Sequence, residues 1–397
     1  MVFLFRFGHD LFVTDTVITI NHPKRKEESS GMKKIRPVLL GILSIGLLTG
    51  CWDQMLLKNV RLILGIGIDK DQGENVLVTF VLPDVSDKKR NAPEIISVTG
   101  ETAREARGNL GKKLTLVPDG AKNRFLMIGE QLAKSDIYAV LDVFYRDPKS
   151  ALNAKIGVVE GRAESLLQTG YMRKPNFILN LDKQILSAES FTIVPEENIQ
   201  SICTVLFDPG QDVILPYLAV GEGAPHIKGV ALFNSKSLTG SLDTKESKLC
   251  LLLADRMGKK ASLTLPIPNK SKKIGSKMTF SVFQTKRKLD VDVNNGKVVV
   301  TIDLLLKAEA EEFSPDHLDE AGQVSKMNEI FSKQLTQEAQ KVVQKLQKAN
   351  CDVFGVGRRI MAFHPNYWKT VDWNNTYPLI TIQPNVKVEI SRPGIVF

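Results

Sequence analysis

Apolar and polar positions in the first part of the chain follow the periods of short strands and amphipathic helices. In "NVRLILGIGIDKDQGENVLVTFVLPD", two β-branched-rich runs at Val60 to Ile68 and Asn75 to Leu82 flank turn residues at Asp69 to Gly73, which predicts a β-hairpin. Beyond it the pattern predicts strands at 94–100, 124–130 and 153–159 and helices at 101–114, 135–144 and 162–168. We expect Ser135 to cap the helix at 135–144, whose apolar face is formed by Ile137, Val140, Leu141 and Phe144.

Strands and helices interleave in this region, but the series opens with a hairpin. This order favours an α+β fold with a mixed sheet over a purely parallel one. Residues 171–208 have a helical but irregular pattern, and they are followed by predicted strands at 212–220 and 226–233 and a helix at 243–256. The segment "PIPNKSKKIGSK", Pro266 to Lys277, has the composition of a linker or solvated loop, so we place a domain boundary near it.

The last third of the chain has the pattern of a separate sheet and a long helix. Two runs with strand periodicity flank Asn294-Asn295-Gly296, and Asn-Gly is the strongest short hairpin signal. A helix is predicted from about Ala321 to Ala349, and we expect it to pack on its own domain's sheet rather than on a partner. Its apolar stripe consists of Val324, Met327, Ile330, Phe331, Leu335, Val342, Val343 and Leu346. A final strand region covers 378–394.

A signal-like segment precedes these elements. From Met32, "MKKIRPVLLGILSIGLLTGC" places three basic residues before an apolar run and ends in Leu48-Thr49-Gly50-Cys51. This order matches a bacterial lipoprotein signal, with cleavage between Gly50 and Cys51 and a lipid thioether on the Cys51 thiol. The 16 uncharged residues from Pro37 to Trp52 fall short of the roughly 20 that span a bilayer. An uncleaved signal anchor is the alternative, and it leaves the bulk of the chain outside the cytoplasm.

The 31 residues before Met32 do not fit a signal peptide, which should begin near its basic region. Lys26-Glu27-Glu28 can be encoded by codons that contain a ribosome-binding sequence just ahead of Met32. We therefore expect translation to start at Met32 and residues 1–31 to be a spurious extension. The predicted organisation is then a signal peptide at 32–50 and domains at 51–208, 209–270 and 271–397.

Composition and charge are those of an ordinary globular protein. The 397 residues are 43% hydrophobic and 24% charged, which excludes general disorder and a polytopic membrane protein. The formal net charge is +9, of which residues 32–50 contribute three, and this mild excess suits a solvated surface or one near anionic lipid. Only four cysteines are present, without zinc or redox spacing, and we expect Cys203 and Cys250 to be buried as small hydrophobes.

The sequence carries no recognisable catalytic, metal or nucleotide motif. The histidines His9, His22, His226, His317 and His364 lack partners at metal-ligand spacing. HExxH, GxSxG and Walker motifs are absent, and "GIG" at Gly65 to Gly67 lacks the GxGxxG spacing. "DVDVNNG" fits a hairpin tip better than a calcium loop. Basic clusters lack interleaved aromatics, so no nucleic acid partner is expected. An exported enzyme with residues scattered along the sequence stays an alternative.

Several short segments together resemble one family, the Ger(x)C lipoproteins, which are C subunits of spore germinant receptors. The matching segments are "GCWDQ" (50–54), "LGIGIDKD" (64–71), "IGEQLAK" (128–134), "VFYRDP" (143–148), "KGVALFNSKSLTGSLD" (228–243) and "CDVFGVGR" (351–358). Their order and spacing carry the resemblance. One position departs from the family pattern: Lys122 and Asn123 stand where a histidine is expected before a strand.

The resemblance implies an elongated protein of three α+β domains with mixed sheets. It implies a lipid anchor on Cys51 at the outer face of the spore inner membrane, and assembly with two integral-membrane subunits that trigger germination in response to nutrients. No enzymatic activity, cofactor or germinant binding by this subunit is expected from it. Of the functional residues, only Cys51 carries over. The alternative from another class is a lipid-anchored solute-binding protein of a transporter, which should show two lobes of repeated βαβ units.

Overall fold

The computed structural model describes residues 59–83, 94–173, 177–267, 275–314 and 322–392. In the first part of the chain the elements are β1 (Val60–Leu62), β2 (Gly65–Lys70), β3 (Val76–Leu82), β4 (Glu94–Gly100), α2 (Ala103–Lys113), β5 (Val117–Asp119), β6 (Phe125–Gly129), α3 (Glu130–Ala133), α4 (Tyr138–Arg146), β7 (Lys155–Val159), α5 (Ala163–Arg173), α6 (Phe177–Ser190) and α7 (Ile199–Leu206). They are followed by β8 (Ile214–Gly221), β9 (Ala224–Asn234), β10 (Ser237–Asp243), α8 (Thr244–Leu253), β11 (Ala261–Pro266), β12 (Lys277–Asn294), β13 (Lys297–Phe313), α9 (Gln323–Lys348), α10 (Val356–Phe363), α11 (Pro365–Trp368), α12 (Trp373–Thr376), the 3₁₀ turn η2 (Tyr377–Leu379) and β14 (Thr381–Arg392).

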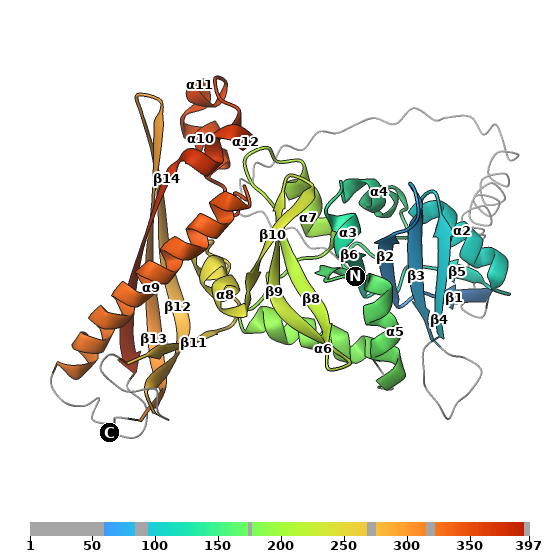
Figure 1. The fold of residues 1–397 in the computed structure, drawn as a ribbon, viewed down its shortest axis with the longest axis horizontal. Helices are drawn as coiled ribbons and strands as arrows, with labels where there is room; N and C mark the ends of the chain where they lie inside the picture. Colours follow the sequence, from blue (N-terminus) through green and yellow to red (C-terminus); the bar gives the residue numbers. More distant parts are fainter. Residues whose placement is uncertain (1–58, 84–93, 174–176, 268–274, 315–321, 393–397) are drawn as a thin grey trace, which may run out of the picture. The chain divides into compact units, whose positions relative to one another are not determined.

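A mixed eight-stranded sheet forms the first part of the fold, with strand order β10-β9-β8-β7-β6-β2-β3-β4 (Figure 1). Its central strands β2, β6, β7 and β8 run parallel, and antiparallel hairpins extend it at both edges. The predicted first hairpin is β2 with β3. The prediction of an α+β fold with mixed sheets is therefore confirmed.

Helices cover both faces of this sheet. On one face, α2, α4 and α7 bury Leu110, Leu141 and Ile202 against strand residues such as Ile128 and Val158. On the other face, α5 and α6 pack Leu167 and Leu181 against a second cluster that includes strand residues Phe125 and Met127. The strands that lie between these helices have nearly continuous apolar sequences, as expected for strands that are buried on both faces. β6, for example, is buried along its whole length.

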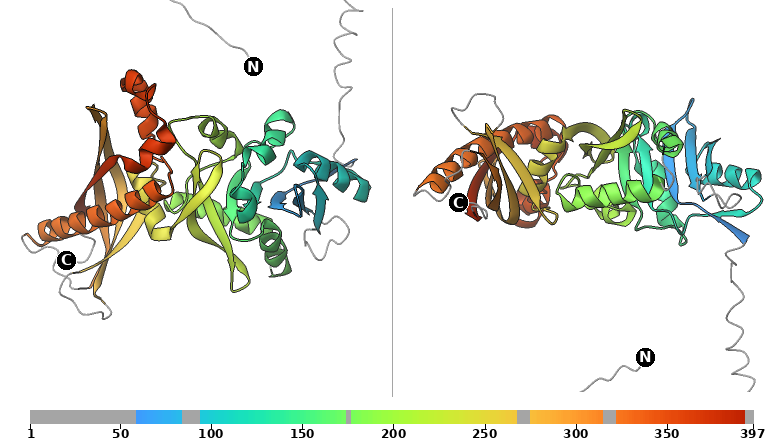
Figure 2. Two further views of the ribbon diagram at one scale, coloured as in Figure 1. Left: turned by 45° about the horizontal axis from the view of Figure 1, so that its top comes forward. Right: turned by 90° about the horizontal axis from the view of Figure 1, so that it is seen from below.

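The C-terminal sheet has the order β11-β12-β13-β14. The turn between β12 and β13 consists of Asn295 and Gly296, which both have positive φ (49° and 77°), as a type I′ hairpin requires. β14 joins β13 in parallel, and α9 lies along one face of the sheet (Figures 1 and 2). Phe331 of α9 packs against Phe280 of β12 in a tilted arrangement, with ring centroids 5.6 Å apart. The predicted hairpin and the predicted packing of the long helix on its own sheet are both confirmed.

Polar side chains of α9 pair with the outer edge of β14. The main-chain N–H groups of Val386, Val388 and Ile390 donate to Thr336 Oγ1 (3.0 Å), Ser332 Oγ (2.9 Å) and Asn328 Oδ1 (3.0 Å). These side chains lie four residues apart on the helix, so they form one row beside the strand. An unpaired strand edge is a template for aggregation, and this row of hydrogen bonds covers it.

Helix α8 joins the two sheets into one continuous core. Leu249, Cys250, Leu251, Leu252 and Leu253 are all buried, and one hydrophobic cluster contains them together with residues of β8 to β10 and of the C-terminal sheet. The first half of α8 is polar and partly exposed, whereas its last five residues are apolar around a whole turn and all buried. The run of leucines in this segment is therefore explained by its burial between the two sheets. Cys250 is buried, as predicted, whereas Cys203 is only half-buried.

Two aspartates form a second connection between the two sheets. The main-chain N–H of Asp352 donates to Asp212 Oδ2 (2.7 Å), and the N–H of Asp212 donates to the carbonyl of Asp352 (3.0 Å). Asp212 Oδ1 also accepts from the N–H of Ser235, at 2.6 Å. Asp212 directly precedes the β8 region and Asp352 precedes α10, so residues 140 positions apart are held together.

The Asp352 carboxylate is itself saturated with donors. It accepts from the N–H groups of Val356 (3.0 Å) and Gly357 (2.8 Å) in the first turn of α10 and from the indole N–H of Trp373 (3.2 Å). Asp352 is 1% exposed, and burial raises the pKa of its carboxyl to about 7. A buried acid stays in place here because the start of a helix supplies the hydrogen bonds that water would otherwise provide.

Some predictions differ from the structure. Ser135 is not a cap: the side chain that accepts from the first turn of α4 is Asp136, from Tyr138 N at 2.8 Å, because Ser135 still belongs to the turn that ends α3. The sequence pattern missed β5, β10, β11 and the short helices α3 and α10 to α12, and the predicted strand at Val60 to Ile68 is divided into β1 and β2. The predicted border at 208/209 falls between α7 and β8, and the eight-stranded sheet continues across it. The domain borders stay a prediction.

The row of α9 side chains predicts a cost for Ser332→Ala. This change leaves the N–H of Val388 without its partner, and we expect the free energy of unfolding to fall by about 1–2 kcal/mol. Ser325→Ala is the matched control, since Ser325 is an exposed serine in the first turn of the same helix and experiences a similar change in helix propensity. Urea unfolding measures both. Equal midpoints for the two variants would contradict the edge-pairing role.

Asp352→Ala should destabilise the protein by roughly 3 kcal/mol or more, because it leaves several buried donors unpaired. Asp372→Ala, at an exposed N-cap, should cost only about 1 kcal/mol. Urea unfolding of the two variants distinguishes these values.

A pH series tests the same carboxyl. Its pKa rises on folding from the ordinary 3.8 to about 7, so the folded state holds the proton more tightly than the unfolded chain. The contribution of Asp352 to the free energy of unfolding should therefore decrease as pH rises from about 4 to about 7 and stay constant above. Asp352→Asn lacks the titrating carboxyl, so the difference in the free energy of unfolding, wild type minus variant, should decrease over that range. A difference that increases over that range would contradict the assignment.

Candidate functional site

The predicted site residues Gly50 and Cys51 lie outside the described residues, as does His317. Within the described ranges, no group of three or more His, Cys, Asp or Glu side chains could hold a metal ion. In the same part of the chain, no helix combines the length and the apolar character needed to cross a membrane. The candidate site must therefore be sought among the other motif residues.

Asp69, the acid of "LGIGIDKD", caps a helix. Its Oδ1 accepts from the N–H of Ala163 (2.7 Å) and its Oδ2 from the N–H of Glu164 (2.9 Å), at the start of α5. Asp69 is 2% exposed, and burial raises the pKa of its carboxyl. A Cβ on Gly129, in "IGEQLAK", would lie 2.0 Å from Asp69 Oδ1. The two motifs thus meet at one buried carboxylate, and only glycine leaves room for it.

The glycines of "GIG" have a packing role. A Cβ on Gly65 would lie 2.5 Å from the Phe125 ring, and one on Gly67 would lie 2.9 Å from Leu167 Cδ1 of α5. Side chains fill the space that a nucleotide phosphate would need.

Asp243, the last residue of "KGVALFNSKSLTGSLD", caps α8. Its Oδ1 accepts from the N–H groups of Lys245 (2.8 Å) and Glu246 (2.9 Å), and the Glu246 side chain accepts from Asp243 N in return. This is a complete capping box. One role is therefore shared by Asp69, Asp243 and Asp352. Each binds N–H groups at the start of a helix that have no partner within the helix.

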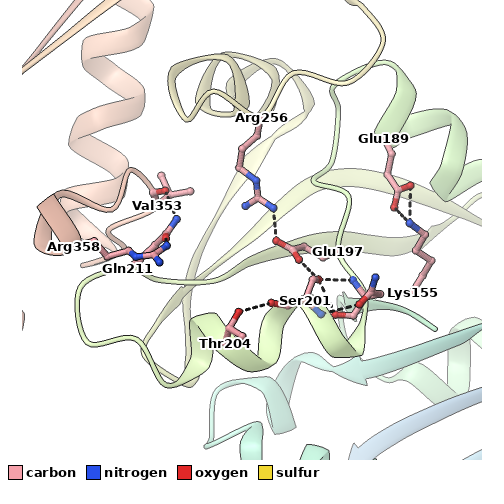
Figure 3. Close-up of polar contacts among 10 residues, drawn as sticks. Lys155, Glu189, Glu197, Ser201, Thr204, Gln211, Arg256, Val353 and Arg358 are labelled. Atoms are coloured by element: carbon pink, nitrogen blue, oxygen red, sulfur yellow. Dashed lines mark hydrogen bonds and ion pairs between the residues drawn. The ribbon is translucent and has the colours of Figure 1, made fainter. Parts of the chain in front are cut away.

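Buried charges between the sheet and its helices are paired. Lys155 Nζ lies 2.9 Å from Glu189 Oε1, and burial raises the pKa of Glu189. Glu197 accepts from both Arg256 and Ser201, and Figure 3 shows these side chains in one row beside the Lys155–Glu189 pair. The row connects α7 to the segment after α8. Ion pairs of this kind position the elements that they join.

Gln211 bridges the segment before β8 to the start of α10. Its Nε2 donates to the carbonyl of Val353 (3.4 Å), and its Oε1 accepts from Arg358 Nη1 (2.8 Å), as Figure 3 shows. Arg358 also lies 2.8 Å from Asp208. "CDVFGVGR" is thus bound to the 208–212 segment both by these contacts and by the Asp212–Asp352 pair.

Sequence reasoning flagged one further residue without assigning it a role. Asn123, at the position that departs from the family pattern, lies at a small cavity next to β2 and β3. Its side chain is buried, and its amide atoms have no hydrogen-bond partner. The sequence contains no local signal for this cavity, because its walls come from strands and helices far apart along the chain.

Known proteins resemble the chain along nearly its whole length. The family model described as "Spore germination protein N-terminal domain" matches residues 53–220, and the one described as "Spore germination B3/ GerAC like, C-terminal" matches residues 228–394. Spore germination protein GerQC of Bacillus cereus is 20% identical over 361 residues, which cover 91% of this chain and 99% of that protein. Spore germination protein B3 of Bacillus subtilis (strain 168) is 23% identical over 366 residues, which cover 88% of this chain and 95% of that protein.

A solved structure, the crystal structure of the GerBC protein, shares the fold. It has a TM-score of 0.56 and 18% sequence identity, and the match covers 83% of this chain and 97% of that chain. The two family models match in the order that their names give, first the N-terminal and then the C-terminal domain. The chain belongs to the Ger(x)C family of spore germination proteins.

Proposed function

We propose that this protein is the lipid-anchored C subunit of a spore nutrient germinant receptor and acts without catalysis. The observation that carries the proposal is the match to spore germination proteins, which covers 91% of this chain and 99% of GerQC. The occupied carboxylates of Asp69, Asp243 and Asp352 support it. Acids whose oxygens bind helix N–H groups are not available as general acids or bases.

The anchor in this proposal is Cys51. A single acyl chain holds a protein to a membrane only marginally, whereas two chains hold it stably. Diacylglycerol on the Cys51 thiol provides two, so the protein would stay at the outer face of the spore inner membrane without a spanning helix. Its folded part would then be free to contact two integral-membrane subunits of the receptor.

The sheet topology favours this function over a solute-binding protein. That class should show two similar lobes, each built from repeated βαβ units. Here one mixed eight-stranded sheet and one four-stranded sheet have different orders and different helices, and they share a buried core around α8. Such an arrangement has no pair of matched lobes that could close over a solute. We therefore keep the receptor subunit as the single proposed function.

Deletion of the gene tests the receptor role. In a strain without redundant receptors, spores that lack this chain should lose the response to at least one nutrient and still germinate with a non-nutrient trigger. Loss of optical density after nutrient addition measures the response, and the intact gene restored in trans is the control. Normal germination with every nutrient would overturn the proposal.

Cys51→Ala tests the anchor. Without the thiol no diacylglyceryl thioether can form, so the protein should move from the membrane fraction to the soluble fraction or accumulate as the unprocessed precursor. Cys203→Ala is the matched control, because it removes a half-buried thiol from the folded part and should leave membrane fractionation unchanged. Fractionation of both variants, followed by immunoblotting, checks this. A Cys51→Ala protein that is processed and stays in the membrane fraction would rule out lipid anchoring at this residue.

A further inference from the structure

The C-terminal sheet has one face that α9 does not cover. On the other face, buried side chains such as Leu289 of β12, Leu304 of β13 and Val388 of β14 belong to one cluster with the apolar residues of α9. Successive residues of a strand point to opposite sides of a sheet, so the residues between these have their side chains on the uncovered face. Most of them are exposed. We call this face the open face.

Two lysines flank a leucine in the middle of the open face. In the register of the sheet, Leu305 of β13 lies between Lys286 of β12 and Lys387 of β14. Residues that are paired in this way have their side chains on the same face. Neighbouring strands are roughly 4.8 Å apart, so the main chains of the two lysines are roughly 10 Å apart. Leu305 is partly exposed and both lysines are exposed.

The charges of these two lysines are not neutralised locally. Neither Lys286 nor Lys387 has an ion-pair partner among the residues that the structure describes. Lys288, the next lysine on the open face of β12, differs from them because its Nζ lies 2.5 Å from Asp290 Oδ2. Glu389 lies two residues beyond Lys387 on β14, but the two side chains form no ion pair. Two ammonium groups are thus available to an external anion.

A groove runs across the strands at this position. Its volume is about 410 Å³, and its lining includes Lys286, Leu305 and Lys387. The one acid among its lining residues is Asp303, whose Oδ1 accepts from Asn385 Nδ2 at 3.0 Å. The groove therefore combines an apolar centre with an unpaired ammonium group on either side.

The lining of the groove indicates what kind of partner fits it. Proteins that bind a bilayer surface insert apolar and aromatic side chains, and single-stranded nucleic acids stack on aromatic ones. None of the described residues that line this groove is aromatic. An extended peptide segment fits better, because its alternate side chains point to one side at intervals of roughly 7 Å. An apolar residue with an acid two positions before it and another two positions after it would match Lys286, Leu305 and Lys387.

We propose that this groove is the docking site for an extended acidic segment of another protein, with the pattern acidic-x-apolar-x-acidic. Its apolar side chain would lie on Leu305, and its two carboxylates would form charge-assisted hydrogen bonds with Lys286 and Lys387. Contacts of this kind determine specificity and association rate and weaken as salt rises. This inference goes beyond the proposed receptor role, which specifies no contact surface, and it does not depend on that role.

The test measures the binding of a fluorescein-labelled peptide, Ser-Glu-Ser-Leu-Ser-Glu-Ser, to the full chain in a non-ionic detergent by fluorescence anisotropy. The wild type should bind it at low salt and release it as salt is added. Lys286→Gln/Lys387→Gln should weaken binding by about tenfold or more, because both counter-charges are lost. The matched control, Lys183→Gln/Lys245→Gln, removes the same net charge from two exposed helical positions and should stay within about twofold of the wild type.

Charge exchange and a rearranged peptide test the geometry. Lys286→Glu/Lys387→Glu should lose the acidic peptide and instead bind Ser-Lys-Ser-Leu-Ser-Lys-Ser, which the wild type should not bind. Ser-Glu-Glu-Leu-Ser-Ser-Ser has the same composition, but its two acids point to opposite sides of an extended chain. It should bind the wild type about fivefold or more weakly than the first peptide.

Equal weakening in the two glutamine double variants would overturn the proposal, because net charge alone would then explain binding. Equal binding of the two acidic peptides, or no binding of either, would also overturn it. So would displacement of the labelled peptide by phosphatidylglycerol in mixed micelles at a lower concentration than by unlabelled peptide, which would identify a lipid headgroup as the ligand. The rearranged peptide is tested on the wild type, so it gives an answer even if a variant fails to fold. None of these outcomes depends on germination, and the proposed receptor function can fail or stand separately.

Discussion

One buried residue, Asp352, binds the start of α10 and the Trp373 indole through its carboxylate and the segment before β8 through its main chain. The partner of its main chain is Asp212, beside the eight-stranded sheet. A charged group so deeply buried is costly unless every lone pair finds a donor. The segments that supply those donors, the first turn of α10 and the residue Trp373, are therefore fixed in position.

The same principle recurs at the other motifs by which this family is recognised. Asp69 binds the start of α5, and Asp243 binds the start of α8, while Gly129 leaves room for the Asp69 carboxylate. The N–H groups in the first turn of a helix have no partner within the helix, so a nearby carboxylate can bind them. A search for catalytic acids would select Asp69 and Asp352, because both are buried and have raised pKa values. Their hydrogen bonds to helix N–H groups indicate that these residues stabilise the fold. This agrees with the proposed function, in which the protein acts without catalysis.

Local signals in the sequence were sufficient for much of the fold. The Asn295-Gly296 turn and the apolar stripe of α9 could be predicted because turn type and helix period depend on adjacent residues. The parallel pairing of β14 with β13 could not, since some seventy residues separate the strands. The N-cap at Ser135 was wrong because Asp136, one residue on, is the better acceptor for that turn. For the site, the lipobox around Cys51 is a local pattern, whereas the cavity at Asn123 arises only from folding.

The receptor assignment depends on partners that the chain alone does not contain. Affinity purification of the tagged protein from detergent-solubilised spore membranes tests it most directly, with quantitative mass spectrometry of what is recovered. The account predicts that two polytopic membrane proteins of the same receptor co-purify with the chain at a constant ratio, in more than one mild detergent. Recovery of the chain alone under all of these conditions, or with a transporter in place of receptor subunits, would contradict it.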